Sequence, residues 1–200
     1  MIVYHGSYCE IKHPNIEFSR DALDFGKGFY VTSIKEQAIN WAERFKLRGK
    51  KSYINIYNLD LAKIKEQYHI NEYITYSEDW LDFILECRGG SDVYLRYDII
   101  IGGIADDRVY NTIELYEDNL INKEEALKRL RYYKPNNQIC IVNQEIIKKY
   151  LNYEESMDYF YNSITYDLIS NGVGDMHCRG VKYLTDELLI EYGMMVAPNV

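Results

Sequence analysis

The feature that most restricts the fold of this chain is residues 24–32, which read Asp-Phe-Gly-Lys-Gly-Phe-Tyr-Val-Thr. Two glycines one residue apart allow a tight turn, and the aromatic and β-branched residues that follow favour a short strand. Further upstream, residues 2–5 predict another short strand, which ends in an imidazole and is followed by Gly6. The sequence therefore predicts two early strands whose functional side chains stand next to glycines.

Composition limits the classes to which the chain can belong. It has 200 residues, 47% hydrophobic and 27% charged, which is typical of one soluble globular domain with a buried core. The longest apolar run, residues 99–105, is far shorter than the about 20 residues that span a bilayer. No signal segment is recognised at the N-terminus. We expect a cytoplasmic protein without a membrane partner.

The cysteines and charges narrow the expected ligands. The four cysteines are scattered without a close pair, which favours reduced thiols and argues against a metal site. A net charge of −8 disfavours sequence-independent binding of nucleic acid through a broad basic face. Residues 1–51 nevertheless carry nine basic and six acidic side chains, so an anionic ligand would be drawn to this part.

Hydrophobic periodicity predicts a mixed α/β (α+β) protein, because β-branched runs alternate with segments of 3.6-residue period. Strands are predicted at residues 2–5, 28–32, 52–58, 97–104 and 138–142. Helices are predicted at residues 34–48, 78–88, 107–116, 123–133 and 144–151, with one or two more from about Tyr153 onward. For the first helix, Ser33 is the expected N-cap, Glu36 completes a capping box, and Trp41 belongs to the apolar face.

His5-Gly6-Ser7, residues 25–32 and the helix predicted after them resemble the first two NAD-binding blocks of the ADP-ribosyltransferases. The similarity is greatest to the diphtheria-toxin-like and poly-ADP-ribose-polymerase-like branch, whose signature is His, Tyr and an acid. The chain also resembles a family of small uncharacterised bacterial domains, often encoded as toxin–antitoxin or defence genes. The resemblance covers about residues 2–151. It implies a domain of residues 1–151 with split sheets around a central NAD cleft. Residues 152–200 are not explained by the resemblance, and we expect them to form a small helical extension packed on that domain.

The resemblance also implies roles for individual residues. Gly6 allows close approach, so that a peptide N–H and C=O can bind the nicotinamide amide. His5 would donate a hydrogen bond to a ribose hydroxyl, and the Tyr30 ring would stack on nicotinamide. The other positions expected to contact NAD are Ser7, Gly28, Phe29, Thr32 and Asp106.

The third signature element departs from the family, because Gln138 stands where the catalytic glutamate is expected. A neutral amide can accept from the ribose hydroxyl but places no charge near an oxocarbenium ion. Asp106 and Asp107 could replace the missing charge, or Asp106 could cap the next helix. Glu145 is better explained as a helix-start residue.

The resemblance implies an NAD-dependent mono-ADP-ribosyltransferase that modifies an intracellular macromolecule as a toxin or defence effector. An NAD glycohydrolase, and a degenerate transferase fold that binds NAD or a partner without chemistry, are the alternatives. An antitoxin or regulatory protein is a possible partner. The acceptor stays open among protein, RNA, DNA and small molecules.

Overall fold

The computed structural model describes residues 1–104, 107–118, 120–130 and 136–157, together with residues 168, 171–173, 183, 184, 186, 187 and 190. The strands are β1 (Ile2–Ser7), β2 (Phe29–Val31), β3 (Tyr53–Leu59), β4 (Ile70–Glu72), β5 (Ile99–Gly102), β6 (Gln138–Ile141) and β7 (Leu151–Met157). The helices are α1 (Lys35–Lys46), α2 (Leu61–Gln67), α3 (Glu78–Arg88), α4 (Asp107–Glu117), α5 (Lys123–Leu130) and α6 (Gln144–Tyr150). Two 3₁₀ helices are η1 (Ile16–Phe18) and η2 (Asp92–Arg96).

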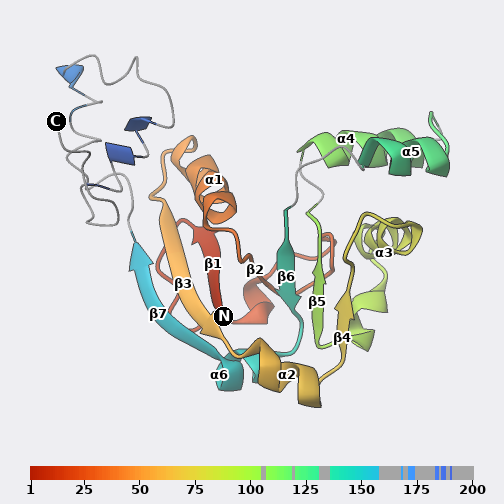
Figure 1. The fold of residues 1–200 in the computed structure, drawn as a ribbon, viewed down its shortest axis with the longest axis horizontal. Coiled ribbons are helices and arrows are strands. Elements are labelled where there is room, and N and C mark those ends of the chain that lie inside the picture. The colour runs from red at the N-terminus through yellow and green to blue at the C-terminus, as the bar shows by residue number, and fades with distance from the viewer. Residues whose placement is uncertain are drawn as a thin grey trace.

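The strands form two sheets (Figure 1). The first sheet is antiparallel with the order β1-β3-β7, and the second has the order β2-β6-β5-β4 with β4 parallel to β5. Helices α2 and α6 lie together at the lower end in this view, and α3 lies beside the second sheet. The expectation of an α+β protein with two sheets is confirmed. The α2 helix and the β4 strand were not predicted.

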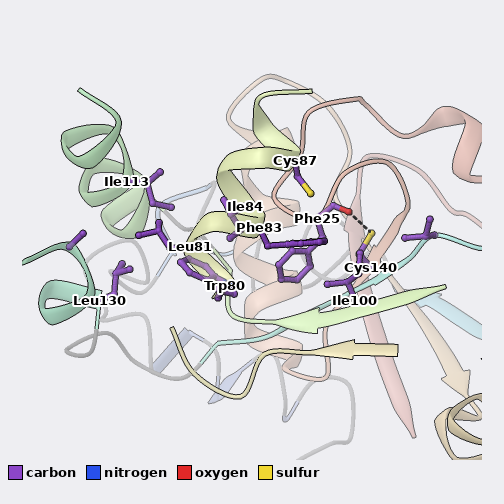
Figure 2. Close-up of a cluster of buried hydrophobic side chains, with 12 residues drawn as sticks. Phe25, Trp80, Leu81, Phe83, Ile84, Cys87, Ile100, Ile113, Leu130 and Cys140 are labelled. Atoms are coloured by element: carbon purple, nitrogen blue, oxygen red, sulfur yellow. Dashed lines mark hydrogen bonds between the residues drawn. The ribbon is translucent and has the colours of Figure 1, made fainter. Parts of the chain in front are cut away.

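The second sheet presents its two faces to different cores, because successive side chains of a strand alternate. From β2, Phe29 and Val31 enter a core that they share with Val3 and Tyr57 of the first sheet. Tyr30 leaves the opposite face and packs against a second core. Figure 2 shows this second core, to which α3 contributes Trp80, Leu81, Phe83, Ile84 and Cys87.

Three helices begin where they were predicted, at residues 78, 123 and 144, and a capping side chain precedes each of them. Ser77 begins α3, Asn122 begins α5 and Asn143 begins α6. In each case the side-chain oxygen accepts a hydrogen bond from a backbone N–H two or three residues later, at 3.2, 2.9 and 2.9 Å. Such a bond satisfies one of the N–H groups that the first helical turn leaves unpaired.

The expected start of α1 was wrong. Ile34 is the N-cap, and no side chain caps this helix. The Ser33 hydroxyl instead accepts a hydrogen bond from Asn137 Nδ2 at 2.6 Å, just before β6. Trp41 was also assigned to the wrong environment, because it is 44% exposed while Ala38 and Ala42 form the buried face.

The chain beyond α6 differs from the expected helical extension at its beginning. Residues 153–157 continue β7, which pairs with β3 as the third strand of the first sheet. A prediction of helix from Tyr153 is therefore wrong for these residues, and most of the remaining extension lies outside the described residues. Of the helices in the described part, none has the length and apolar character needed to cross a membrane.

Candidate functional site

Strands β1 and β2 pair at one point and then separate. Tyr4 and Thr32 exchange two backbone hydrogen bonds, of 2.8 and 2.9 Å. Continued antiparallel pairing would place Gly6 opposite Tyr30, but the Tyr30 carbonyl instead lies 2.6 Å from Nδ1 of His5. Because peptide directions alternate along a strand, the N–H and C=O of Gly6 point into this split, where β2 offers them no partner.

The hydrogen bond to Tyr30 fixes the chemical form of His5. A carbonyl oxygen can only accept, so Nδ1 carries the proton and Nε2 is the acceptor in the neutral ring. Burial lowers the pKa of His5 below its ordinary value of 6.5, although the bond to Tyr30 acts in the opposite direction. At neutral pH the imidazole therefore presents an acceptor at Nε2, and the expectation that it donates is revised.

Asn55 explains why β1 leaves β2 after one bridge. Its side chain, buried in the middle of β3, donates to Ser7 Oγ at 3.0 Å and to the Cys9 carbonyl at 3.2 Å. Its oxygen accepts from Ile11 N at 2.7 Å and from Ser156 Oγ at 2.5 Å. These bonds hold the end of β1 and the following loop to β3 and β7.

Gly6 is required by the approach of α1. A Cβ at this position would stand 2.3 Å from the Ala38 carbonyl oxygen and 2.9 Å from the Ala42 nitrogen. Both are backbone atoms of a helix, which cannot move aside independently. One face of Gly6 is therefore covered by α1, while its peptide edge faces the split.

The Tyr30 ring is half-buried and held at its tip. Its hydroxyl donates to the Gly26 carbonyl at 2.6 Å and accepts from Phe25 N at 3.1 Å. Burial raises the pKa of Tyr30 well above its ordinary value, so the phenol is neutral. The ring leaves the sheet on the face that carries Cys140, while the His5 ring packs on Phe29 at 4.7 Å between centroids. His5 thus contacts Tyr30 through its backbone rather than through its ring.

Three of the expected NAD contacts have structural partners. Ser7 donates to the Cys9 carbonyl and accepts from Asn55, as part of the network that holds the end of β1. Thr32 donates to Asn137 Oδ1 at 2.9 Å, beside its backbone bridge to Tyr4. Gly28 lies against β6, where a Cβ would meet the sulfur of Cys140 at 2.5 Å.

Gln138 begins β6 and is 7% exposed. Its Nε2 donates to Asp24 Oδ2 at 3.2 Å and to the Gly103 carbonyl at 3.4 Å. Asp24 is in turn bound by Arg88, whose Nε and Nη2 both reach Oδ1, at 3.0 and 2.7 Å. Sequence reasoning missed Asp24 and Arg88, because the contact to Gln138 spans 114 positions.

A family model described as "Protein of unknown function (DUF3990)" matches residues 1–153. The chain belongs to this family. The match includes both sides of the split, Asp24 and Gln138. No curated protein and no solved structure matches the chain.

The structure describes only some of the acids weighed as substitutes in this DUF3990 protein. Asp106 lies outside the described residues, and Asp107 is the first residue of α4. Glu145 binds Lys148 at 2.9 Å in the first turn of α6, as expected for a helix-start residue. Among the described residues, the acidic side chain that contacts Gln138 is Asp24.

Trp41 adds an exposed aromatic ring to α1. It follows Gln37 by one helical turn, and Gln37 Nε2 donates to the Asn137 carbonyl at 2.5 Å. Arg44 lies over its ring, with the guanidinium carbon 4.8 Å from the centroid. The 3.6-residue pattern gave the opposite prediction, because Trp41 is adjacent on the helix to the buried Ala38 and Ala42.

Thiol and metal chemistry have little support in the described part of the chain. Burial raises the pKa of Cys87 to about 12, and it also raises that of Cys140, so both thiols are protonated at neutral pH. No cluster of three His, Cys, Asp or Glu side chains among the described residues is suited to hold a metal ion.

Proposed function

We propose that this protein is an NAD-dependent mono-ADP-ribosyltransferase that modifies a macromolecule. The observation that carries the proposal is the split between β1 and β2, where the peptide groups of Gly6 lack a strand partner beside the imidazole of His5. A primary carboxamide has one acceptor and two donors, so it can replace the missing strand by bonding both the N–H and the C=O of Gly6. Nicotinamide carries such a group.

Aromatic side chains on β2 and α1, the two elements next to the split, support recognition of a planar ring. The Tyr30 ring is fixed through its hydroxyl, which reduces the entropy lost when a ligand stacks on it. Trp41 offers a second, more exposed ring on α1, the helix whose Ala38 and Ala42 cover Gly6. We assign nicotinamide stacking to Tyr30 and extend it to Trp41.

The proposed reaction breaks the bond between nicotinamide and ribose in a dissociative step. His5 Nε2 accepts a hydrogen bond from a ribose hydroxyl, because Nδ1 already donates to Tyr30. Gln138 accepts from the second hydroxyl through Oε1. The ADP-ribosyl group then passes to an acceptor nucleophile, whose proton is released to solvent while nicotinamide departs. A neutral amide at this position favours single transfer over chain elongation, in keeping with a toxin or defence effector in the cytoplasm.

The neutral side chain of Gln138 also favours one rival, a transferase fold that binds NAD or a protein partner, such as an antitoxin, without chemistry. Incubation with NAD labelled in the adenylate separates the possibilities. Label on macromolecules supports transfer, free ADP-ribose indicates a glycohydrolase, and intact NAD with measurable binding indicates a degenerate fold. Calorimetric titration supplies the binding measurement.

A matched pair of histidine variants locates the binding site. His5→Ala removes the ring at the split, whereas His69→Ala removes an exposed ring that precedes β4. We expect His5→Ala to weaken NAD binding at least tenfold and His69→Ala to leave it unchanged. Equal NAD affinity in the two variants would place the ligand elsewhere.

A further inference from the structure

The orientation of the Gln138 amide is determined by its two partners. Asp24 Oδ2 and the Gly103 carbonyl are both acceptors, so the group that faces them must be the NH₂. A flipped amide would bring its oxygen against two other oxygens. Oε1 is therefore turned away from both, and it accepts no hydrogen bond from the residues that the structure describes.

The carboxylate that fixes this orientation is itself held in place. Arg88 binds one oxygen of Asp24 through two nitrogens, and the two side chains are 16% and 15% exposed. The second oxygen faces Gln138. Arg88 ends α3 and Gln138 begins β6, so the three side chains join the loop before β2 to a helix and a central strand.

We propose that Asp24 is the positioning residue for Gln138 and carries the negative charge that related transferases place at position 138. The proposal rests on the proposed function only for what Oε1 contacts, a ribose hydroxyl. A carboxylate that accepts from Nε2 polarises the amide and makes Oε1 a stronger acceptor, because hydrogen bonds in a chain reinforce one another. The amide thus relays part of the charge of Asp24 to the reacting sugar.

This arrangement reverses the effect expected from introducing the glutamate of the transferases that the chain resembles. Gln138→Glu would bring a second carboxylate within about 3 Å of Asp24 and beside the Gly103 carbonyl, where like charges oppose ionisation. Exchanging the two groups, in Asp24→Asn with Gln138→Glu, restores one amide facing one carboxylate. The double variant moves the negative charge to position 138, whereas Asp24→Asn alone removes it. Comparing the two shows whether activity depends on the position of the charge or only on its presence.

The test compares the parent protein with Q138E, D24N and the D24N/Q138E double variant. Nicotinamide release from NAD is measured from pH 5.5 to 8, and thermal midpoints are measured over the same range. We expect at least tenfold slower release in each single variant and recovery to within about threefold in the double variant. The midpoint of Q138E should lie further below that of the parent at pH 8 than at pH 5.5, because protonation of the introduced carboxylate removes the repulsion.

Asp98→Asn is the matched control, because Asp98 accepts from the Asn143 side-chain amide at 2.8 Å at the other end of the β5–β6 pair. It should lower the thermal midpoint without changing nicotinamide release per folded molecule. Faster release by Q138E, or effects that simply add in the double variant, would overturn the proposal. If the parent neither binds nor cleaves NAD, the proposed function fails, while the midpoints of the four proteins still decide whether Asp24 and Gln138 are coupled.

Discussion

The two edges of β2 are built differently. Along β6, every residue from Phe29 to Val31 has a partner in register, and Gly28 allows the backbones to approach closely. Along β1, pairing is confined to the bridge between Tyr4 and Thr32. Beyond this bridge, the imidazole of His5 donates a hydrogen bond to the Tyr30 carbonyl. The first edge uses its peptide groups to hold the sheet together. The second edge leaves the peptide groups of Gly6, on β1, without a strand partner, and the proposed function places the ligand there.

The largest effect is expected from adding a methyl group at Gly6 or Gly28, two of the glycines that have close neighbours. Gly6→Ala and Gly28→Ala should each lower the free energy of unfolding by about 3 kcal/mol, because the new Cβ meets backbone or β6 atoms at under 3 Å. Gly49→Ala is the control, since its Cβ would meet nothing within 4 Å and only its positive φ of 69° costs about 1 kcal/mol. Urea unfolding measures all three. Similar values for Gly6→Ala and Gly49→Ala would show that α1 does not press on β1.

A smaller effect is expected when the bonds that pull β1 away are removed. Asn55→Ala leaves buried groups of Ser7, Cys9 and Ile11 without their partner, which should cost about 2 kcal/mol of stability. Ser156→Ala removes one bond of the same network and should cost about 0.5–1 kcal/mol. Hydrogen exchange of the Gly6 amide, followed by NMR, would show whether the split closes. An unchanged exchange rate in Asn55→Ala would contradict this role of Asn55.

The elements themselves follow from local sequence, but the split does not. Caps such as Ser77 and Asn143 act within three residues, so a pattern search finds them. The apolar strands were predicted because a run of β-branched residues is also a local signal. The polar residues of β7 instead resemble the start of a helix. His5, Gly6 and Tyr30 were identified through their resemblance to a family motif. That the His5 imidazole meets the Tyr30 carbonyl where the two strands separate could be seen only in three dimensions.

Long-range polar contacts account for most of what was missed. Asp24 accepts a hydrogen bond from Gln138, 114 positions away, and Asn137 donates one to the Ser33 hydroxyl, 104 positions away. Neither contact has a periodic signal, because each depends on how loops are placed by the packed sheets. The prediction for Trp41 was wrong for a related reason, since the helical period does not show which residue at the border of the apolar face stays exposed.

Trp41 offers a test that should alter binding more than folding. Trp41→Ala removes a ring that is 44% exposed, so stability should change by no more than about 1 kcal/mol. Loss of a stacking surface should weaken NAD binding about tenfold, which corresponds to about 1.4 kcal/mol. Leu47→Ala, at an 88% exposed position just after α1, is the control and should change neither. Unaltered NAD affinity in Trp41→Ala would show that Trp41 does not contact NAD and that the binding residues lie on β1 and β2.

The smallest effect concerns the pH dependence of the split edge. The pKa of His5 is lower in the folded than in the unfolded chain, so the unfolded chain binds more protons below about pH 6.5. This contribution to stability should therefore be complete above pH 6.5 and should decline as pH falls through the lowered pKa. His5→Gln keeps a donor toward Tyr30 and should remove this part of the slope in thermal unfolding between pH 7.5 and 5. An identical slope in parent and variant would show that His5 does not control it.

The contact between Gly6 and α1 has a consequence for how occupancy could be detected. The same residue touches the helix backbone with one face and offers its peptide edge to the split. A ligand that forms hydrogen bonds with the peptide groups of Gly6 would therefore restrain α1 without contacting the helix itself. Slower amide exchange along α1 would then report a bound ligand, even one too weakly held to be seen by its own signal.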